Sequence, residues 1–197
     1  MVSLEDIELK ALENDVPIMD PEGLDFMIDQ LKEHHATSLL EIGTAVGYSA
    51  SMMVTQVDHL CIDSIERDHN RFLEAKKNVE ALGLEESIHL FEADALEFNN
   101  DDLTFAPYDC LFIDAAKAQY QKFFEKYIGL VKEDGFVIVD NLDFHGMIYD
   151  IPHIKNRNTR ALVRKIKRFK DWIFNNDAYE VTYYGVGDGI CIITRKD

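Results

Sequence analysis

The chain predicts an α/β fold, a doubly wound sheet of seven strands that is mostly parallel and carries an antiparallel hairpin strand at its C-terminal end. Three apolar runs stop abruptly at the acidic residues Glu41, Asp114 and Asp140. Such runs are typical of buried parallel strands, whose carboxyl ends share the edge where these folds bind ligands. Strand-like and helix-like segments alternate through the middle of the chain, which implies right-handed crossovers.

The seven strands are expected where short apolar runs are bounded by turn residues. They cover residues 38–42, 59–65, 87–92, 108–113, 135–139, 178–184 and 190–194. The first five alternate with helices, whereas the last two are joined by the glycine-rich segment 185–189. A glycine-rich joint of that length is a hairpin signal, so the final strands add an antiparallel element to the sheet.

The helices are predicted from capping residues and from apolar residues at helical spacing. They cover residues 3–14, 21–35, 48–56, 69–82, 118–130 and 156–175. Asp20 followed by Pro21 marks the start of the second helix. Asp68 caps the fourth helix, and Gly83 closes it.

Length and composition predict one domain that spans residues 1–197. The hydrophobic content is 47% and the charged content is 29%, both ordinary for a globular protein. No apolar run reaches the roughly 20 residues that cross a bilayer, and the acidic N-terminus lacks a signal-peptide layout. The three cysteines show no metal or redox spacing. We therefore expect a cytoplasmic protein that has no membrane contact.

The charge is distributed unevenly along the chain. The formal net charge is −17, which argues against general affinity for nucleic acid. Residues 153–170, however, hold eight of the 20 basic residues and no acid. A basic stripe on an acidic body suits a focused contact with a polyanion. The alternative is a solvated helix face that balances an acidic neighbour or a partner subunit.

The turn after the first strand indicates a nucleotide-like cofactor. Gly43 would let the backbone turn tightly, and Gly47 would let it approach a ligand. The pattern lacks the third glycine of the dinucleotide motif. Glu66 ends the second strand 23 residues after Gly43, where an acid accepts hydrogen bonds from ribose hydroxyls. Asp94 follows the third strand and could bond an adenine amino group. These features favour S-adenosylmethionine over NAD.

Oxygen donors meet at the ends of the fourth and fifth strands. Asp114, Asp140 and Asn141 offer two carboxylates and an amide oxygen, which suit Mg²⁺, with Mn²⁺ or Ca²⁺ as substitutes. His145 is either a softer metal ligand or a substrate contact. Lys117 lies one helical turn after Asp114 and is a candidate general base for a substrate hydroxyl.

Three motifs resemble the metal-dependent class I O-methyltransferases, the family that includes catechol and caffeoyl-coenzyme A O-methyltransferases. They are EIGTAVGYSA at 41–50, FIDAAK at 112–117 and VDN at 139–141. The resemblance covers nearly the whole chain. Residues 140–146, followed by the arginine-rich segment, are similar to the branch of bacterial tRNA 5-hydroxyuridine methyltransferases.

The resemblance implies a Rossmann-like sheet, a homodimer and a short helical lid over about residues 1–36. It also implies Asp114, Asp140 and Asn141 as metal ligands and Lys117 as the catalytic base. It places cofactor contacts on Met19, Glu41, Gly43, Ser49, Glu66, Asp94, Ala95 and Asp114.

The expected chemistry needs a substrate that presents two adjacent oxygens to the metal. The O4 and O5 atoms of 5-hydroxyuridine do so, and the wobble base of a tRNA anticodon loop could be splayed into the pocket. Phosphate contacts are then expected from Arg157, Arg160, Arg164 and Arg168. The alternatives are a small catechol or phenol as substrate, a non-catalytic cofactor-binding protein, and an NAD-dependent oxidoreductase, which the missing third glycine disfavours.

Overall fold

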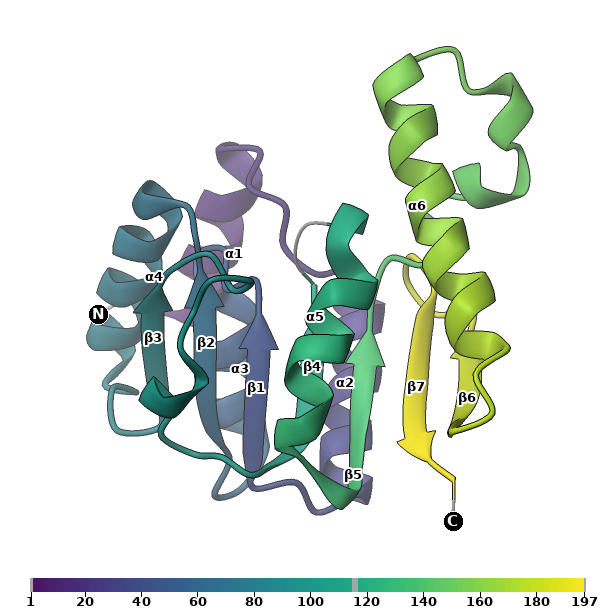
Figure 1. Ribbon diagram of the computed structural model, residues 1–197. Helices are drawn as coiled ribbons and strands as arrows, with labels where there is room; N and C mark the ends of the chain where they lie inside the picture. Colours follow the sequence, from purple (N-terminus) through teal and green to yellow (C-terminus); the bar gives the residue numbers. More distant parts are fainter. Residues whose placement is uncertain (1, 115–116, 197) are drawn as a thin grey trace.

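A computed structural model describes residues 2–114 and 117–196 and confirms the predicted fold class (Figure 1). Over these residues one seven-stranded sheet has the order β3-β2-β1-β4-β5-β7-β6. All neighbouring pairs from β3 to β5 are parallel, and β7 is antiparallel to both β5 and β6. The strands are β1 (Ser38–Ile42), β2 (Cys61–Glu66), β3 (Ile88–Glu92), β4 (Tyr108–Ile113), β5 (Val131–Val139), β6 (Tyr179–Tyr184) and β7 (Ile190–Arg195).

Helices cover both faces of the sheet. One face packs against α2 (Pro21–Glu33), α3 (Tyr48–Gln56) and α4 (His69–Leu82), and α1 (Leu4–Glu13) packs on α3. The other packs against α5 (Tyr120–Tyr127) and α6 (Arg157–Phe174). In Figure 1, α2 and α3 lie behind the sheet and α5 lies in front of it. The strands in the middle of the sheet are therefore buried on both faces, as their apolar runs predict.

The capping residues predicted from the sequence occupy the helix ends. The Asp20 side chain accepts from the backbone N–H of Glu22 at 3.0 Å, and Pro21 is the first helical residue of α2. Asp68 accepts from the Arg71 N–H at 3.0 Å, and Gly83 ends α4 in the left-handed conformation. These interactions satisfy backbone donors that a helix start leaves unpaired.

The largest departures from the predicted boundaries are in two elements, and the other predicted ends agree to within two residues. The helix expected over 118–130 is divided into the 3₁₀ turn η2 (Lys117–Gln119), α5, and the 3₁₀ turn η3 (Ile128–Leu130). Gly129, a poor helix former, lies in the last of these turns. Strand β5 starts four residues earlier than expected, because its pairing with β4 contains a bulge. A Cβ at Gly135 would lie 2.8 Å from the Asp109 carbonyl oxygen, so the bulge requires glycine there.

Three further 3₁₀ turns lie outside the predicted elements. They are η1 (Asn100–Asp102), η4 (Met147–Tyr149) and η5 (Ile151–His153). The last two lie between β5 and α6, and in Figure 1 this segment extends above the sheet with the upper part of α6. No helix in the described part of the chain is long and apolar enough to cross a membrane.

Candidate active site

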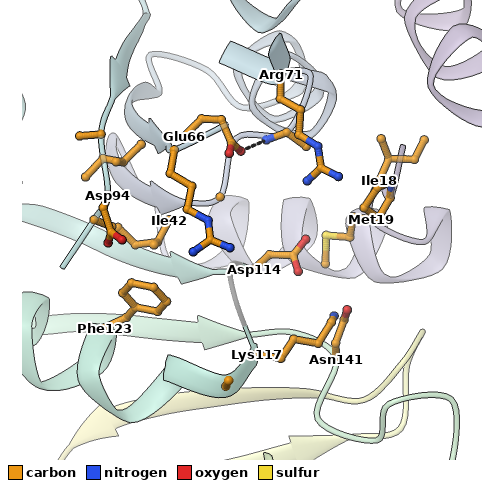
Figure 2. A pocket seen from close by; sticks show the side chains of 18 of the residues that line it. Ile18, Met19, Ile42, Glu66, Arg71, Asp94, Asp114, Lys117, Phe123 and Asn141 are labelled. Carbon is orange, nitrogen blue, oxygen red and sulfur yellow. Dashed lines mark hydrogen bonds between the residues drawn. The ribbon is translucent and has the colours of Figure 1, made fainter. Parts of the chain in front are cut away.

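A cavity of about 440 Å³ opens at the carboxyl ends of β1, β2, β3 and β4 (Figure 2). Most of the residues predicted for the site line it, from elements far apart in the sequence. They are Met19, Gly43, Glu66, Asp94, Ala95, Asp114, Lys117 and Asn141. The motif residues 115 and 116 lie outside the described residues. The parallel order of the strands explains this convergence, since their carboxyl ends share one edge.

Glu66 is held in a fixed orientation at one end of the cavity. Its Oε2 accepts from the Ala45 N–H at 2.9 Å, and its Oε1 accepts from the Asp68 N–H at 2.8 Å. The first contact is drawn in Figure 2. Gly43 has φ +105°, a conformation that favours glycine, and thereby lets the chain turn above β1. Each carboxylate oxygen of Glu66 keeps a free lone pair that could accept from a ribose hydroxyl.

Asp94 and Ala95 lie beside Glu66 along the same edge. The Asp94 Oδ1 accepts from the Leu96 N–H at 2.9 Å, which fixes the turn after β3. Ala95 is buried, and its carbonyl oxygen accepts from the Tyr127 hydroxyl and from Lys126 Nζ. This rigid turn is suited to holding the flat ring of a base, the role predicted for Asp94.

Glu41 and Ser49 lie outside the residues that line the cavity. Glu41 is completely buried and accepts from the Ser49 and Ser64 hydroxyls at 2.7 and 2.5 Å. Burial raises the pKa of Glu41 to about 7, although the two hydroxyls oppose the shift. The side chain therefore joins β1, β2 and α3 beneath the cofactor turn, and direct contact of either residue with a cofactor stays a prediction.

Gly47, which was expected to approach a ligand, is not among the residues that line the cavity. Gly47 is the left-handed N-cap of α3, with φ +76°. A Cβ at this position would lie 3.4 Å from the Cβ of Ala75 in α4. The glycine therefore permits close packing of two helices, and Gly43 and Ala45 bring the backbone to the cavity instead.

The predicted metal ligands lie together across the pocket from Glu66. Asp114 and Asn141 line the cavity, whereas Asp140 is 2% exposed and is not among the lining residues. Its Oδ1 accepts from the Asn141 N–H at 2.6 Å. The Asn141 Nδ2 donates to Asp140 Oδ2 at 2.5 Å, which leaves Asn141 Oδ1 as a free oxygen donor. Among the described residues no group of three His, Cys, Asp or Glu side chains is placed to hold a metal ion. A metal site here would therefore need the Asn141 amide oxygen beside the two carboxylates.

This donor set fits a divalent cation. Burial raises the pKa of both Asp114 and Asp140, and repulsion between the two carboxylates raises the pKa of Asp140 further. Lys117 lowers both values but supplies only one positive charge. A hard cation would neutralise the excess charge, and carboxylate and amide oxygens are the ligands that Mg²⁺ prefers.

Lys117 lines the cavity on the same side as Asp114 and Asn141 (Figure 2). Its Nζ lies 5.9 Å from the centre of the Phe144 ring. The Tyr120 hydroxyl donates to the Asp140 carbonyl oxygen at 2.9 Å and ties the start of α5 to the end of β5. Lys117 is thus placed to reach a substrate oxygen next to the candidate metal ligands.

Several lining residues were not predicted. Arg67 and Arg71 reach the cavity from the turn after β2 and from α4, and Phe123 and Leu162 reach it from α5 and α6. Arg67 follows Glu66 directly, so its position beside a strand end was a usable signal. Arg71 and Leu162 are helix residues whose orientation depends on how α4 and α6 pack, which the sequence does not reveal.

The four arginines predicted to bind RNA form one stripe on α6. Arg157, Arg160, Arg164 and Arg168 follow helical spacing, opposite the buried Val163 and Ile166. Arg157, Arg164 and Arg168 are exposed, and Arg160 donates to the Ile154 carbonyl oxygen at 3.3 Å.

Two other bases of the segment are engaged elsewhere. Lys167 pairs with Asp171, and Lys170 lies between Asp143 and the Tyr183 ring. The basic surface on α6 that is available to a ligand therefore includes fewer side chains than the eight basic residues of the segment.

The sheet order and the cavity at its carboxyl edge are those of a Rossmann-like methyltransferase. The sequence model of the family described as O-methyltransferase matches residues 4–196. The chain therefore belongs to the O-methyltransferase family, whose members use S-adenosylmethionine.

Individual relatives agree with this assignment. A caffeoyl-CoA O-methyltransferase from Stellaria longipes is 26% identical over 182 residues, which cover 87% of this chain and 72% of the relative. A Staphylococcus aureus protein, whose description as a caffeoyl-CoA O-methyltransferase is provisional, is 34% identical. Its crystal structure has a TM-score of 0.93 and covers 100% of this chain and 93% of its own.

A Bacillus cereus O-methyltransferase in complex with SAH has the same fold. Its TM-score is 0.82 at 22% identity, and the match covers 98% of this chain and 90% of that one.

Proposed function

We propose that this protein is an S-adenosylmethionine- and Mg²⁺-dependent tRNA methyltransferase. It would methylate the 5-hydroxyl group of 5-hydroxyuridine at the wobble position to give 5-methoxyuridine. The observation that carries the proposal is a single cavity with Glu66 and Asp94 at one end and Asp114, Lys117 and Asn141 at the other. The arginine stripe on α6 supports RNA as the substrate.

The chain's own residues account for binding and proton transfer. Glu66 would accept from the ribose hydroxyls of the cofactor and Asp94 from its adenine amino group, which holds the sulfonium end toward Asp114. Asp114, Asp140 and Asn141 would hold the metal, which when bound acidifies a substrate hydroxyl as a Lewis acid. Lys117 would accept the hydroxyl proton. The substrate oxygen would then attack the methyl carbon while the bond from that carbon to the sulfonium sulfur breaks, so that S-adenosylhomocysteine leaves. The fixed geometry supplies the rate advantage of proximity.

The orientation of α6 supports a large substrate. Leu162 points into the cavity, whereas the arginine stripe lies on the opposite, solvent-facing side of the same helix. A small phenol in the cavity would be too short to touch that side. An RNA stem-loop whose base enters the cavity would be long enough to pass around the helix and place phosphates on the arginines.

A small catechol or related phenol is the second candidate substrate. The caffeoyl-CoA O-methyltransferase among the relatives favours it, as does the net charge of −17, which repels nucleic acid at long range. Such a substrate would use the same cavity and the same Lys117 but no residue of the arginine stripe.

The two substrates can be separated with one charge-reversal variant. We expect Arg157→Glu, Arg164→Glu and Arg168→Glu together to raise KM for tRNA bearing 5-hydroxyuridine by at least about tenfold, because three phosphate contacts become repulsive. Turnover of a free catechol should change little, since none of the three residues lines the cavity. The measurement is initial rate by mass spectrometry of nucleosides and of methylated catechol.

The matched control reverses Lys32, Lys76 and Lys77, three exposed bases on α2 and α4, and changes the net charge equally. An equal rise in KM for tRNA in both variants would mean that the rise comes from the change in net charge and not from lost contacts of the arginine stripe. Unchanged tRNA kinetics in the α6 variant would leave the small-molecule reading as the better one.

The metal requirement has its own test. EDTA should abolish methyl transfer by the wild-type protein, and added Mg²⁺ or Mn²⁺ should restore it, while SAH binding measured by calorimetry stays intact. Full activity in the chelator would rule out the metal-dependent mechanism.

A cytosolic homodimer is also part of the proposal. The exposed Leu9 and Leu12 on α1 and Leu73 on α4 offer an apolar surface, and the Lys10–Glu74 ion pair links these two helices. The three cysteines are free thiols, which suits a reducing compartment. Light scattering after size exclusion would measure the oligomeric state.

A further inference from the structure

The segment that follows β5 contains a run of left-handed residues. Phe144, His145 and Gly146 have φ values of +46°, +54° and +74°, and Asn141 has +63°. A non-glycine residue in this region costs about 1–3 kcal/mol and persists only where the surrounding structure enforces it. Histidine and asparagine adopt this conformation more readily than most residues, but the bulky Phe144 does not. Some part of the fold must therefore hold residues 141–146 in place.

The tip of the β6–β7 hairpin provides that hold. The Asp188 Oδ1 accepts from the His145 N–H at 2.5 Å, and the Asp188 carbonyl oxygen accepts from the Asp143 N–H at 2.9 Å. The next carbonyl oxygen, of Gly189, accepts from the Leu142 N–H at 2.9 Å. Three backbone donors of one short segment are thus bound by two residues that lie more than forty positions later in the chain.

The hairpin tip is itself rigid. Gly189 has φ +83°, and a Cβ there would lie 2.8 Å from the Asp143 Cγ, so only glycine fits against that side chain. The Asp143 carboxylate accepts from Tyr149, Tyr183 and Lys170. The contact between residues 141–146 and the hairpin tip is therefore held by Gly189 on one side and by the donors to Asp143 on the other.

The second carboxylate oxygen of Asp188 has no partner in the described part of the chain. Its Oδ2 is buried and accepts no hydrogen bond there. His145 Nδ1 is 3.7 Å away, which is beyond hydrogen-bond distance but within reach of an ion pair when the histidine is protonated. A buried acceptor without a partner costs about 1–3 kcal/mol. The backbone bonds from Leu142 and Asp143 place the hairpin tip directly beside the residues that follow Asn141. The Asp188 charge also adds to the rise in pKa of Asp114, Asp140 and Tyr120.

We propose that Asp188 is a positioning residue for the metal half of the cavity: Oδ1 fixes the left-handed run that carries Asn141, and Oδ2 would accept from a water carried by a bound metal. It is not a direct ligand, because no three carboxylates among the described residues are arranged to hold a metal. Partners of this kind, one shell outside a metal, orient its ligands and strengthen its binding. The inference rests on the proposed metal-dependent function.

The test compares Asp188→Asn with Asp188→Ala and uses Mn²⁺ as the probe. Asparagine keeps an oxygen for the His145 N–H but replaces Oδ2 with a donor, so we expect Mn²⁺ affinity, measured by electron paramagnetic resonance, to fall roughly 10- to 100-fold. Alanine removes both oxygens and should weaken binding at least as much. SAH affinity by calorimetry should stay within about twofold for Asp188→Asn, because Glu66 and Asp94 lie across the cavity. Asp177→Asn, an exposed carboxylate before β6, is the control.

The possible outcomes separate a failure of the Asp188 inference from a failure of the proposed function. A wild-type protein that binds SAH but no Mn²⁺ would overturn the proposed metal-dependent function itself. Wild-type Mn²⁺ affinity in Asp188→Asn would overturn this inference alone and leave that function standing. A variant that fails to fold, or that loses SAH and Mn²⁺ together, would also overturn it, because a general structural role moves both affinities.

Discussion

Glu66 reaches the cavity with each carboxylate oxygen already bound to a backbone N–H, of Ala45 and of Asp68. Its orientation is therefore set before any cofactor arrives, and little side-chain entropy remains to be lost on binding. We expect Glu66→Gln to weaken S-adenosylmethionine binding by about 2 kcal/mol, roughly 30-fold, because hydrogen bonds to a charged acceptor become bonds to a neutral one. Calorimetry measures the loss.

The control for Glu66→Gln is Glu92→Gln, which removes an acid at the end of the adjacent strand. Glu92 pairs with His69 on the surface and does not line the cavity. Equal affinities for Glu66→Gln and wild type would remove the ribose assignment.

Among the residues that the structure describes, Lys117 is the one lysine that lines the cavity, and it lies beside the candidate metal ligands. Substitution by methionine keeps much of its volume and removes the proton acceptor. We expect kcat to fall by about 10²- to 10⁴-fold, the range for loss of a general base. The cofactor affinity should stay near the wild-type value. A kcat within threefold of wild type would mean that Lys117 only balances the charge of Asp114 and Asp140.

At the scale of elements, the sequence predicted the parallel part of the sheet because each of its strands ends at a residue with a visible chemical role. Glu66, Asp114 and Asn141 follow apolar runs, and β-sheet geometry then brings them to one edge. The segment between β5 and α6 could not be predicted in this way. Its conformation depends on hydrogen bonds from the hairpin tip at Asp188, which the sequence presents only as part of a glycine-rich turn.

Helix packing set a second limit on prediction. Hydrophobic spacing located α6, but it did not reveal that Leu162 enters the cavity or that Lys170 turns inward toward Asp143. Both outcomes depend on the rotation of the helix against the sheet. In the same way, the division of the helix expected over 118–130 into α5 and two 3₁₀ turns depends on tertiary contacts such as that of Tyr120 with Asp140.

Asp109 joins three strands at the edge of the sheet opposite the cavity. Its carboxylate accepts from the backbone and hydroxyl groups of Thr37 and Ser38 at the start of β1, and from Lys132 Nζ in β5. Partial burial alone would raise the pKa of Asp109, but these hydrogen bonds outweigh it and lower the pKa to about 2. The ionised form is therefore more stable in the folded protein than in the unfolded chain.

This pKa predicts a pH-dependent contribution to stability. Because the folded pKa is depressed, the stabilisation is fully present above the ordinary value of 3.8 and is lost as pH falls through about 2. We expect Asp109→Asn to lower the free energy of unfolding by about 2 kcal/mol at pH 7 and by progressively less below pH 4. Urea titrations at several pH values measure the difference.

The control for Asp109→Asn is Asp134→Asn, an exposed position in β5. It should change stability by less than about 0.5 kcal/mol at any pH. A destabilisation of Asp109→Asn that stays constant from pH 7 to pH 3 would contradict the charge-based account and point to lost hydrogen bonds alone.

At the scale of the whole molecule, the acidic and the basic parts of the surface lie on different elements of the fold. The body of the protein carries the acidic excess that gives the net charge of −17, whereas the arginine stripe lies on a helix that extends above the sheet (Figure 1). Strand β7 lies between β5 and β6, so the hairpin tip reaches the end of β5 and α6 packs beside it. The same C-terminal elements thus support both the candidate metal ligands and the candidate RNA surface.

This arrangement predicts a modest salt dependence of RNA binding that resides in α6. On single-stranded RNA each phosphate contact contributes about −0.7 to the slope of log affinity against log salt concentration. Neutralising Arg157, Arg164 and Arg168 with glutamine should therefore flatten the slope by about 2 for an anticodon stem-loop. Fluorescence anisotropy between 50 and 300 mM KCl would measure it, and glutamine at Lys32, Lys76 and Lys77 should leave the slope unchanged. Parallel slopes for the α6 variant and wild type would mean that the stripe contacts no phosphate, because lost contacts must release fewer counterions.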